Sequence, residues 1–316
     1  MDYEIVDKKI RCKIRENAGS YQPDEEIMKF IGAFKDGYGD NLEAVVFYGS
    51  CLASAMRKPS SFRDFFVLVN EYAPIAKSYV DRLLLPLIPP NLYFISIREG
   101  DKKIDAKYHV LTTKEFMRMA SRFAADHYII GRMCKRVALV WAKDNKIRDV
   151  ILDSIAESFF RNAFITLPLI DSPVDYHNLV ISFLRTSYLS ELRLETPEKI
   201  EQIYQSEKDY YDEIYSRLID MLVDNGELTS RDGKFYFSAG GKWAKRKVII
   251  YLWKSKIRHV ARFPKMIRAM DNWLEQLLGK FERTYGKKLE LTDFEKRHKF
   301  YTVIKYFYKI KIKGNN

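Results

Sequence analysis

The sequence predicts an α+β fold in three units: a mixed-sheet unit over residues 1–115, a helical unit over residues 116–240 and a basic amphipathic helical region over residues 241–316. Three observations carry this prediction. Short apolar strands alternate with helical segments before Thr113, helical periodicity then takes over, and positive charge concentrates after Gly240. A chain of 316 residues with 47% hydrophobic residues is long enough to bury a substantial core.

The first unit combines one early helix with four strands. Helical periodicity covers about residues 24–34, and "EAVVFYGS" and "DFFVLV" are short apolar strands. The segment "LYFISIREGDKKIDAKYHVL" predicts two further strands around a turn at Gly100 and Asp101. These strands form the expected mixed sheet.

The second unit is predicted to be packed helices over about residues 113–195, followed by a small β-ribbon. In "YSRLIDMLVDNGELTSRDGKFYF" a helix runs into two short strands, with turn residues at Asn225-Gly226 and Asp232-Gly233. A helix followed by a ribbon is typical of winged-helix modules. The best candidate hinge before the basic region is residues 238–241.

The lack of a recognisable signal peptide and the use of cysteine favour a cytoplasmic protein. No segment near Met1 has the pattern of a signal peptide, and the longest apolar runs, such as residues 248–253, fall far short of the ~20 residues of a membrane span. Cys12, Cys51 and Cys134 lack metal-type spacing and cannot all pair with one another, which is typical of a reducing compartment.

The stretch "FYGSCLASAMRKPSSFRDFFVLV" has the layout of the nucleotidyltransferase superfamily: a strand, a Gly-Ser turn, a loop, and an acid at the start of the next strand. In that arrangement Gly49 lets the backbone approach a triphosphate, Ser50 donates a hydrogen bond to it, and Asp64 holds a metal ion. The usual second acid is absent, because Phe66 stands at its position. The alternative is a common turn followed by an ordinary surface Asp.

A third acid lies on a later strand. In "KKIDAKYHVL" the period of two places Asp105, Lys107 and His109 on one face and apolar residues on the other. If this strand neighbours the one that carries Asp64, Asp105 can complete the metal site and Lys107 can neutralise phosphate charge. A solvated polar face of a hairpin is the alternative.

Several short motifs, in the same order along residues 45–193, resemble the mitochondrial-type CDP-diacylglycerol synthases, which are phosphatidate cytidylyltransferases. The family has a Tyr-Gly-Ser turn and a strand in which one Asp precedes Phe, as in "RDFFVLV", so the absent second acid agrees with it. The matching residues are Tyr48, Gly49, Ser50, Asp64, Lys107 and Tyr108, then Gly131, Arg132 and Lys135 of "IGRMCKRV", then Ser187, Tyr188, Glu191 and Arg193 of "SYLSELRL". The departures are His109 for Gly, Arg136 for Pro and Ser190-Glu191 for Gly-Asp.

This resemblance implies transfer of a cytidylyl group from CTP to phosphatidic acid, with Mg²⁺ or another divalent cation. It implies catalytic roles for Asp64 and Lys107, metal ligation by Asp64, and nucleotide binding by the remaining motif residues. The strand pattern adds Asp105 to these as a second catalytic acid and metal ligand. Those nucleotide-binding residues are Tyr48, Gly49, Ser50, Arg132, Lys135, Tyr188, Glu191 and Arg193. Two alternatives stay open: a nucleotidyltransferase acting on nucleic acid or a small molecule, and a non-catalytic winged-helix binder of nucleic acid.

Residues 241–316 hold 21 Lys and Arg against 6 Asp and Glu, a net charge of +15, whereas the whole chain carries +12. A positive segment of this size is expected to meet an anionic partner. Within it, "MIRAMDNWLEQLLGKF" has an apolar stripe at helical spacing that includes Trp273, Leu277 and Phe281, flanked by lysines and aromatic residues. We expect this region to lie on the inner face of a membrane and not to bind nucleic acid; a folded core and nucleic-acid contact are the alternatives.

Overall fold

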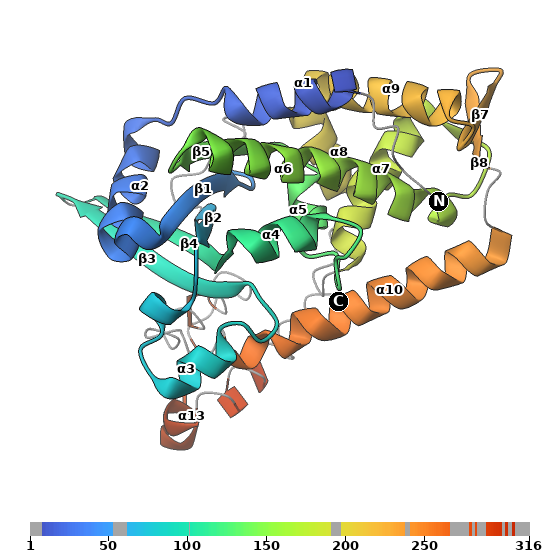
Figure 1. Cartoon of the computed structure of the whole chain (residues 1–316). Coiled ribbons are helices and arrows are strands. Elements are labelled where there is room, and N and C mark those ends of the chain that lie inside the picture. The colour runs from blue at the N-terminus through green and yellow to red at the C-terminus, as the bar shows by residue number, and fades with distance from the viewer. Residues whose placement is uncertain are drawn as a thin grey trace.

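The computed structural model describes residues 8–52, 62–100, 102–190, 197–237, 241–265, 278–279, 282, 289–298, 301–302 and 305–306. It is an α+β fold built on a five-stranded mixed sheet of order β3-β4-β2-β1-β5 (Figure 1). The strands are β1 (Leu42–Tyr48), β2 (Arg63–Val69), β3 (Asn91–Glu99), β4 (Lys102–Thr112) and β5 (Val137–Ala142). β2 and β4 are parallel, and the other neighbouring pairs are antiparallel.

The strand β5 corrects the expectation of uninterrupted helices over residues 113–195. "VALVWA" pairs antiparallel with β1 and closes one edge of the sheet. Six consecutive apolar residues carry no usable period, so a buried strand and a piece of buried helix look alike in sequence. The unit boundary near residue 115 stays a prediction.

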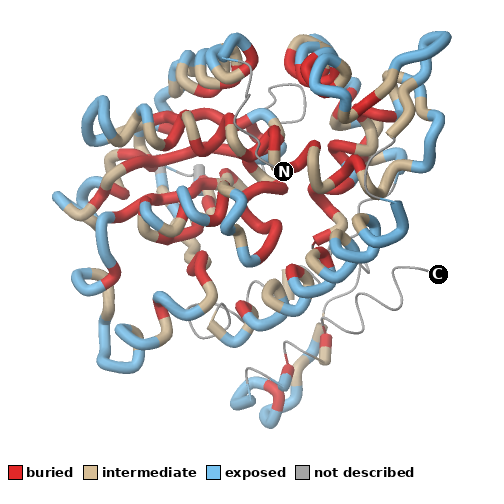
Figure 2. Tube along the Cα trace, turned by 45° about the vertical axis from the view of Figure 1, so that its right-hand side comes forward, coloured by how far each residue is buried: buried red, intermediate tan, exposed pale blue. Residues whose placement is uncertain are grey.

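Helices cover both faces of the sheet. On one face α2 (Glu25–Tyr38), capped by Asp24, packs Phe30 and Phe34 against Phe65 of β2. On the other face a larger core joins the sheet to the remaining helices of the body, and buried residues fill the layer between them (Figure 2). Those helices are α1 (Lys8–Gly19), α4 (Thr113–Ala120), α5 (Ile130–Met133), α6 (Asn145–Thr166), α7 (Tyr176–Leu189), α8 (Pro197–Ser206) and α9 (Lys208–Asp224).

The predicted ribbon is confirmed. After α9, β7 (Leu228–Arg231) and β8 (Lys234–Phe237) form an antiparallel hairpin, and β6 (Val174–Asp175) adds a third short strand to it. Gly226 and Gly233 adopt the left-handed conformation, with φ of +73° and +70°, which a glycine reaches without strain.

A long helix, α10 (Gly241–Ala261), runs beneath the body towards α3 (Tyr79–Leu84), as Figure 1 shows. Leu252 and Ser255 are its buried residues, so most of its surface faces away from the body. Its carboxyl-terminal end is nevertheless tightly attached. A short helix, α13 (Asp293–Arg297), lies further along the chain, and no helix within the described ranges is long and apolar enough to span a bilayer.

The attachment of α10 depends on one buried acid. Asp126 accepts from Arg258 Nε and Arg262 Nη2, each at 2.7 Å, and from the backbone N–H of Tyr128 at 3.1 Å. Burial opposes ionisation of Asp126, but Arg262 and Arg258 outweigh it and hold its pKa below the ordinary value. Lys265 Nζ donates to Ile88 O at 3.2 Å and to Asn91 Oδ1 at 2.9 Å. Part of the basic region therefore binds the protein itself.

Replacing Asp126 with Ala leaves two arginines without their buried anionic partner. Removal of one member of a buried ion pair costs about 3–5 kcal/mol, so we expect the free energy of unfolding, measured by chemical denaturation, to fall by about that amount. Asp171→Ala is the matched control, because Asp171 also pairs with α10, through Lys245, but its side chain is 94% exposed. A surface pair contributes about 1 kcal/mol or less. Equal losses in the two variants would contradict the role assigned to Asp126.

Candidate active site

The Gly-Ser turn lies directly against Asp64. Strand β1 ends at Tyr48, which is paired with Asp64 at the start of β2. Gly49 has a φ of +87°, and a Cβ atom placed on it would lie 2.6 Å from Asp64 Oδ2. Glycine is therefore required here both by backbone conformation and by the close approach of the carboxylate. Gly49 and Ser50 are exposed, so their polar groups are accessible to a ligand.

The strand that carries Lys107 lies next to the strand that carries Asp64, as the predicted site requires. Lys107 stands opposite Asp64 in the parallel ladder between β2 and β4, and its Nζ lies 3.0 Å from Asp64 Oδ1. The Asp64 side chain is 14% exposed and that of Lys107 is 35% exposed. A half-buried carboxylate and an ammonium group thus meet beside the turn.

Phe66 explains why the usual second acid is absent. It is fully buried and stacks on Tyr48, with ring centroids 4.7 Å apart. It also packs at 5.2 Å from the ring of His109 and at 6.2 Å from that of Phe116. A second carboxylate at this position would be buried among aromatic rings, so the site holds one acid on this strand.

Asp105 lies on the same face of β4 as Lys107, two residues closer to the hairpin turn. Its Oδ1 accepts from Ser96 Oγ at 2.5 Å and lies 3.2 Å from Lys103 Nζ. No cluster of three or more His, Cys, Asp or Glu suited to a metal ion occurs in the described part of the chain. The side chains that Asp105 contacts are thus Ser96 and Lys103, so metal ligation by Asp64 together with Asp105 stays a prediction.

The motif residues beyond the sheet are brought together by a close contact between helices. A Cβ atom on Gly131 of α5 would lie 2.7 Å from the backbone oxygen of Ser187 on α7, so only glycine allows this approach. Beside this contact the ammonium of Lys135 lies 4.0 Å from the ring centroid of Tyr188. Two sequence segments more than fifty residues apart therefore contribute to one surface.

Arg132 connects this surface to the turn. Its guanidinium lies 3.6 Å from the ring centroid of Tyr128, and its Nη1 donates to the backbone oxygen of Tyr128 at 3.1 Å. Burial and the charge of Asp64 raise the pKa of the Tyr48 hydroxyl well above its ordinary value, and Arg132 opposes this rise.

Glu191 and Arg193 lie outside the described residues, as do Trp273, Leu277 and Phe281, so their roles stay predictions.

His109 has a structural role that sequence reasoning missed. Its Nδ1 is 2.9 Å from the Tyr48 hydroxyl and its Nε2 is 2.7 Å from the Tyr128 hydroxyl. Burial, followed by the charges of Arg132 and Lys107, lowers the pKa of His109 well below its ordinary value, so the imidazole is neutral. The sequence placed His109 on the polar face of its strand, but its two partners come from distant segments.

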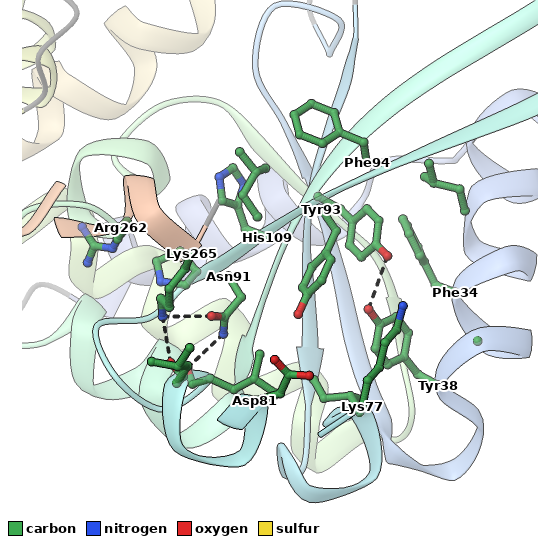
Figure 3. Close-up of a pocket in the computed structure, with 18 of the residues that line it drawn as sticks. Phe34, Tyr38, Lys77, Asp81, Asn91, Tyr93, Phe94, His109, Arg262 and Lys265 are labelled. Atoms are coloured by element: carbon green, nitrogen blue, oxygen red, sulfur yellow. Dashed lines mark hydrogen bonds between the residues drawn. The ribbon is translucent and has the colours of Figure 1, made fainter. Parts of the chain in front are cut away.

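A cavity of about 750 Å³ lies at the β3 edge of the sheet (Figure 3). Tyr93 stands between Tyr38 and Phe34 on one side and His109, Arg262 and Lys265 on the other. The Tyr38 and Tyr108 hydroxyls are 3.5 Å apart within it. His109 also contacts Tyr48, so this cavity is one residue away from the turn at Gly49.

Comparison with protein families matches residues 80–303, more than half of the chain, to a family described as "Phosphatidate cytidylyltransferase, mitochondrial". The matched span includes Lys107, Arg132, Lys135 and Tyr188. Gly49 and Asp64 precede it, so their assignment rests on the geometry of the turn. A search of curated proteins found no match.

Gly49→Ala should disrupt the turn. The left-handed conformation costs a residue with a Cβ about 1–2 kcal/mol, and the new methyl group would also push against Asp64. We expect a lower free energy of unfolding and weaker nucleotide binding, measured by denaturation and by calorimetry with CTP. Gly32→Ala is the control, because Gly32 lies inside α2 with open space around it. That change should stabilise the helix by up to about 1 kcal/mol; unaltered CTP binding by Gly49→Ala would contradict the site.

Proposed function

Because the chain belongs to the mitochondrial phosphatidate cytidylyltransferase family, we propose that it transfers the cytidylyl group of CTP to phosphatidic acid. A phosphate oxygen of phosphatidic acid bonds to the α-phosphorus of CTP, the bond from that phosphorus to the bridging oxygen breaks, and pyrophosphate leaves with the bonding electrons. The product is CDP-diacylglycerol. The family match over residues 80–303 is the observation that carries this proposal.

The arrangement around Gly49 supports the chemistry. The exposed turn at Gly49 and Ser50 would hold the triphosphate, and Lys107, Arg132 and Lys135 would neutralise its charge. A phosphate nucleophile is already anionic, so the reaction needs positioning and charge stabilisation more than a strong general base. This agrees with the neutral, fully engaged imidazole of His109, which has no free nitrogen with which to take a proton.

Asp64, assisted by Asp105, would hold Mg²⁺, which would supply positive charge to stabilise the negative charge that develops on the phosphate oxygens. Asp64 is the better placed of the two, because it touches the turn. Lys107 pairs with the same carboxylate and keeps its charge balanced within the partly buried site.

The substrate lipid lies in a membrane, and the exposed face of α10 supports attachment there. Trp243 is 73% exposed, Trp253 62% and Ile257 65%. Together with Ile250 and Val260 they recur at steps of three, four and seven residues, so they form one stripe on the side of α10 opposite Leu252 and Ser255. Exposed cations lie along the same helix: Lys242, Lys245, Arg246, Lys247 and Lys254. We propose that this exposed face lies in the headgroup region of an anionic membrane, where tryptophan rings and long basic side chains are both favourable.

Neither alternative function gains support from the family match, which specifies a lipid substrate by its name. The hairpin of β7 and β8 keeps the form of a winged-helix ribbon. That form alone does not indicate nucleic-acid binding, since one fold serves many functions.

The reaction is tested with purified protein, labelled CTP, phosphatidic acid in detergent and Mg²⁺. The wild-type protein should form CDP-diacylglycerol, and Asp64→Asn should abolish turnover while the near-isosteric amide keeps the fold. Asp36→Asn, on the exposed surface of α2, is the control and should retain full activity. If folded wild-type protein forms no CDP-diacylglycerol at any divalent-cation concentration, the proposal fails; an active Asp64→Asn variant would exclude Asp64 as the ligand.

Membrane attachment is tested separately, by co-sedimentation with vesicles of phosphatidylcholine and phosphatidic acid. Trp253→Glu should weaken binding at both low and high salt, because it removes apolar burial, which salt does not screen, and adds a repelled charge. Met28→Glu is the control, since Met28 is 50% exposed on α2, away from α10. If Trp253→Glu binds vesicles as well as the wild type does, α10 does not face the membrane.

A further inference from the structure

Three buried side chains form a continuous hydrogen-bonded unit between the turn and the end of α10. His109 lies between the hydroxyls of Tyr48 and Tyr128, at 2.9 and 2.7 Å, and each of the three residues is at most 7% exposed. A neutral imidazole has one N–H donor and one acceptor nitrogen, so one tyrosine donates to His109 and the other accepts from it. Both ring nitrogens are therefore engaged, and the orientation of each ring depends on the others.

One end of this unit reaches the reacting part of the site. Tyr48 is the last residue of β1, is paired with Asp64 and directly precedes Gly49. The position of Tyr48 therefore decides how closely Gly49 approaches the Asp64 carboxylate. A displacement of the Tyr48 backbone would therefore reach the turn that is proposed to hold the triphosphate.

The other end is fixed by the attachment of α10. Two guanidinium groups lie near the ring of Tyr128, with Arg132 at 3.6 Å and Arg262 at 4.6 Å from its centroid. Its backbone N–H donates to Asp126, which Arg262 also binds. His259 of α10 stacks on the same ring at 5.8 Å. The hydroxyl of Tyr128 is thus held in place from several directions.

We propose that Tyr48, His109 and Tyr128 act as one positioning unit, in which His109 holds the Gly49 turn beside Asp64 and ties it to the segment that anchors α10. The expected effect on turnover rests on the proposed cytidylyl transfer, whereas the expected effect on the Gly49 turn does not. His109 and Tyr128 are positioning residues, since they act on the site through Tyr48.

Tyr128→Phe is the first test, because it removes one hydroxyl and keeps the ring that contacts Arg132 and Arg262. We expect kcat to fall by about tenfold or more, because small displacements of a reacting group lower the rate strongly. The KM for phosphatidic acid should stay unchanged. The control is Tyr204→Phe, since Tyr204 is 2% exposed and donates to Asp212 at 2.7 Å, on helices that do not contribute to the turn. It should lose comparable stability and keep full activity.

Two further variants test the role of the imidazole. His109→Gln keeps a donor and an acceptor and should retain more activity than His109→Leu, which keeps neither. Tyr48→Phe combined with Tyr128→Phe should lose less activity than the product of the two single losses, because both act through the same ring. Equal activity of His109→Gln and His109→Leu, or fully multiplicative losses, would overturn the proposal.

A measurement without substrate separates this inference from the reaction itself. The Leu52 N–H donates to Gly49 O at 3.0 Å and closes the turn. Tyr128→Phe should accelerate hydrogen exchange in a peptide covering residues 47–52 by about tenfold, since it removes a bond that holds the turn, whereas Tyr204→Phe should leave that exchange unchanged. Unaltered exchange in Tyr128→Phe would overturn the positioning role even if the enzyme is active, and faster exchange would support it even if CDP-diacylglycerol is not the product.

Discussion

The register between β2 and β4 is the constraint on which the site depends. Side chains alternate across a sheet, so a slip of one residue would move Asp64 to the face of α2 and bring Phe65 to the site. Aromatic packing prevents that slip. Phe65 lies 5.5 Å from Phe30 and 5.4 Å from Phe34, and Tyr108 of β4 lies 5.0 Å from Phe34, measured between ring centroids. The apolar face of the sheet thereby fixes the polar face, and with it the contact between Asp64 and Lys107.

Much of the sheet could be predicted from sequence because its signals are local. Period-two alternation placed Asp105, Lys107 and His109 on one face, and turn residues located the hairpin at Gly100 and the later ribbon. The strand β5 and the helix α1 were not predicted. The apolar run of β5 fits two structures equally well, and α1 is stabilised by packing against α6 and α9, which lie far away in sequence.

The same limit applied to the site. The proximity of the turn, Asp64 and Lys107 could be predicted because each lies in or beside a recognisable strand. The partners of His109 could not be predicted, since Tyr48 and Tyr128 are 61 and 19 residues away along the chain and nothing local links them. The need for glycine at Gly131 likewise becomes clear only when α5 meets α7. Contacts of this kind are long-range and leave no periodic trace in sequence.

The basic residues of segment 241–316 fall into two groups, those bound by the body of the protein and those exposed to solvent. Arg258 and Arg262 bind the buried Asp126, and Lys265 lies among backbone oxygens of residues 84–88, where burial, together with the charge of Arg262, lowers its pKa to about 8. These cations are bound by the body of the protein, whereas those near the start of α10 are exposed. Net charge counted along a sequence therefore overstates the field available to an anionic surface.

The attachment at Asp126 also affects how this chain can change over time. The buried carboxylate of Asp126 depends on arginines more than 130 residues later in the chain, so the two segments must be inherited together. Recombination at residue 240 with a relative that lacks arginines at these positions would leave the buried charge of Asp126 unmatched. Shortening the chain there to simplify production would do the same. The segment that follows residue 240 is thus part of the architecture of this protein, and a segment without these arginines would need a compensating change at Asp126.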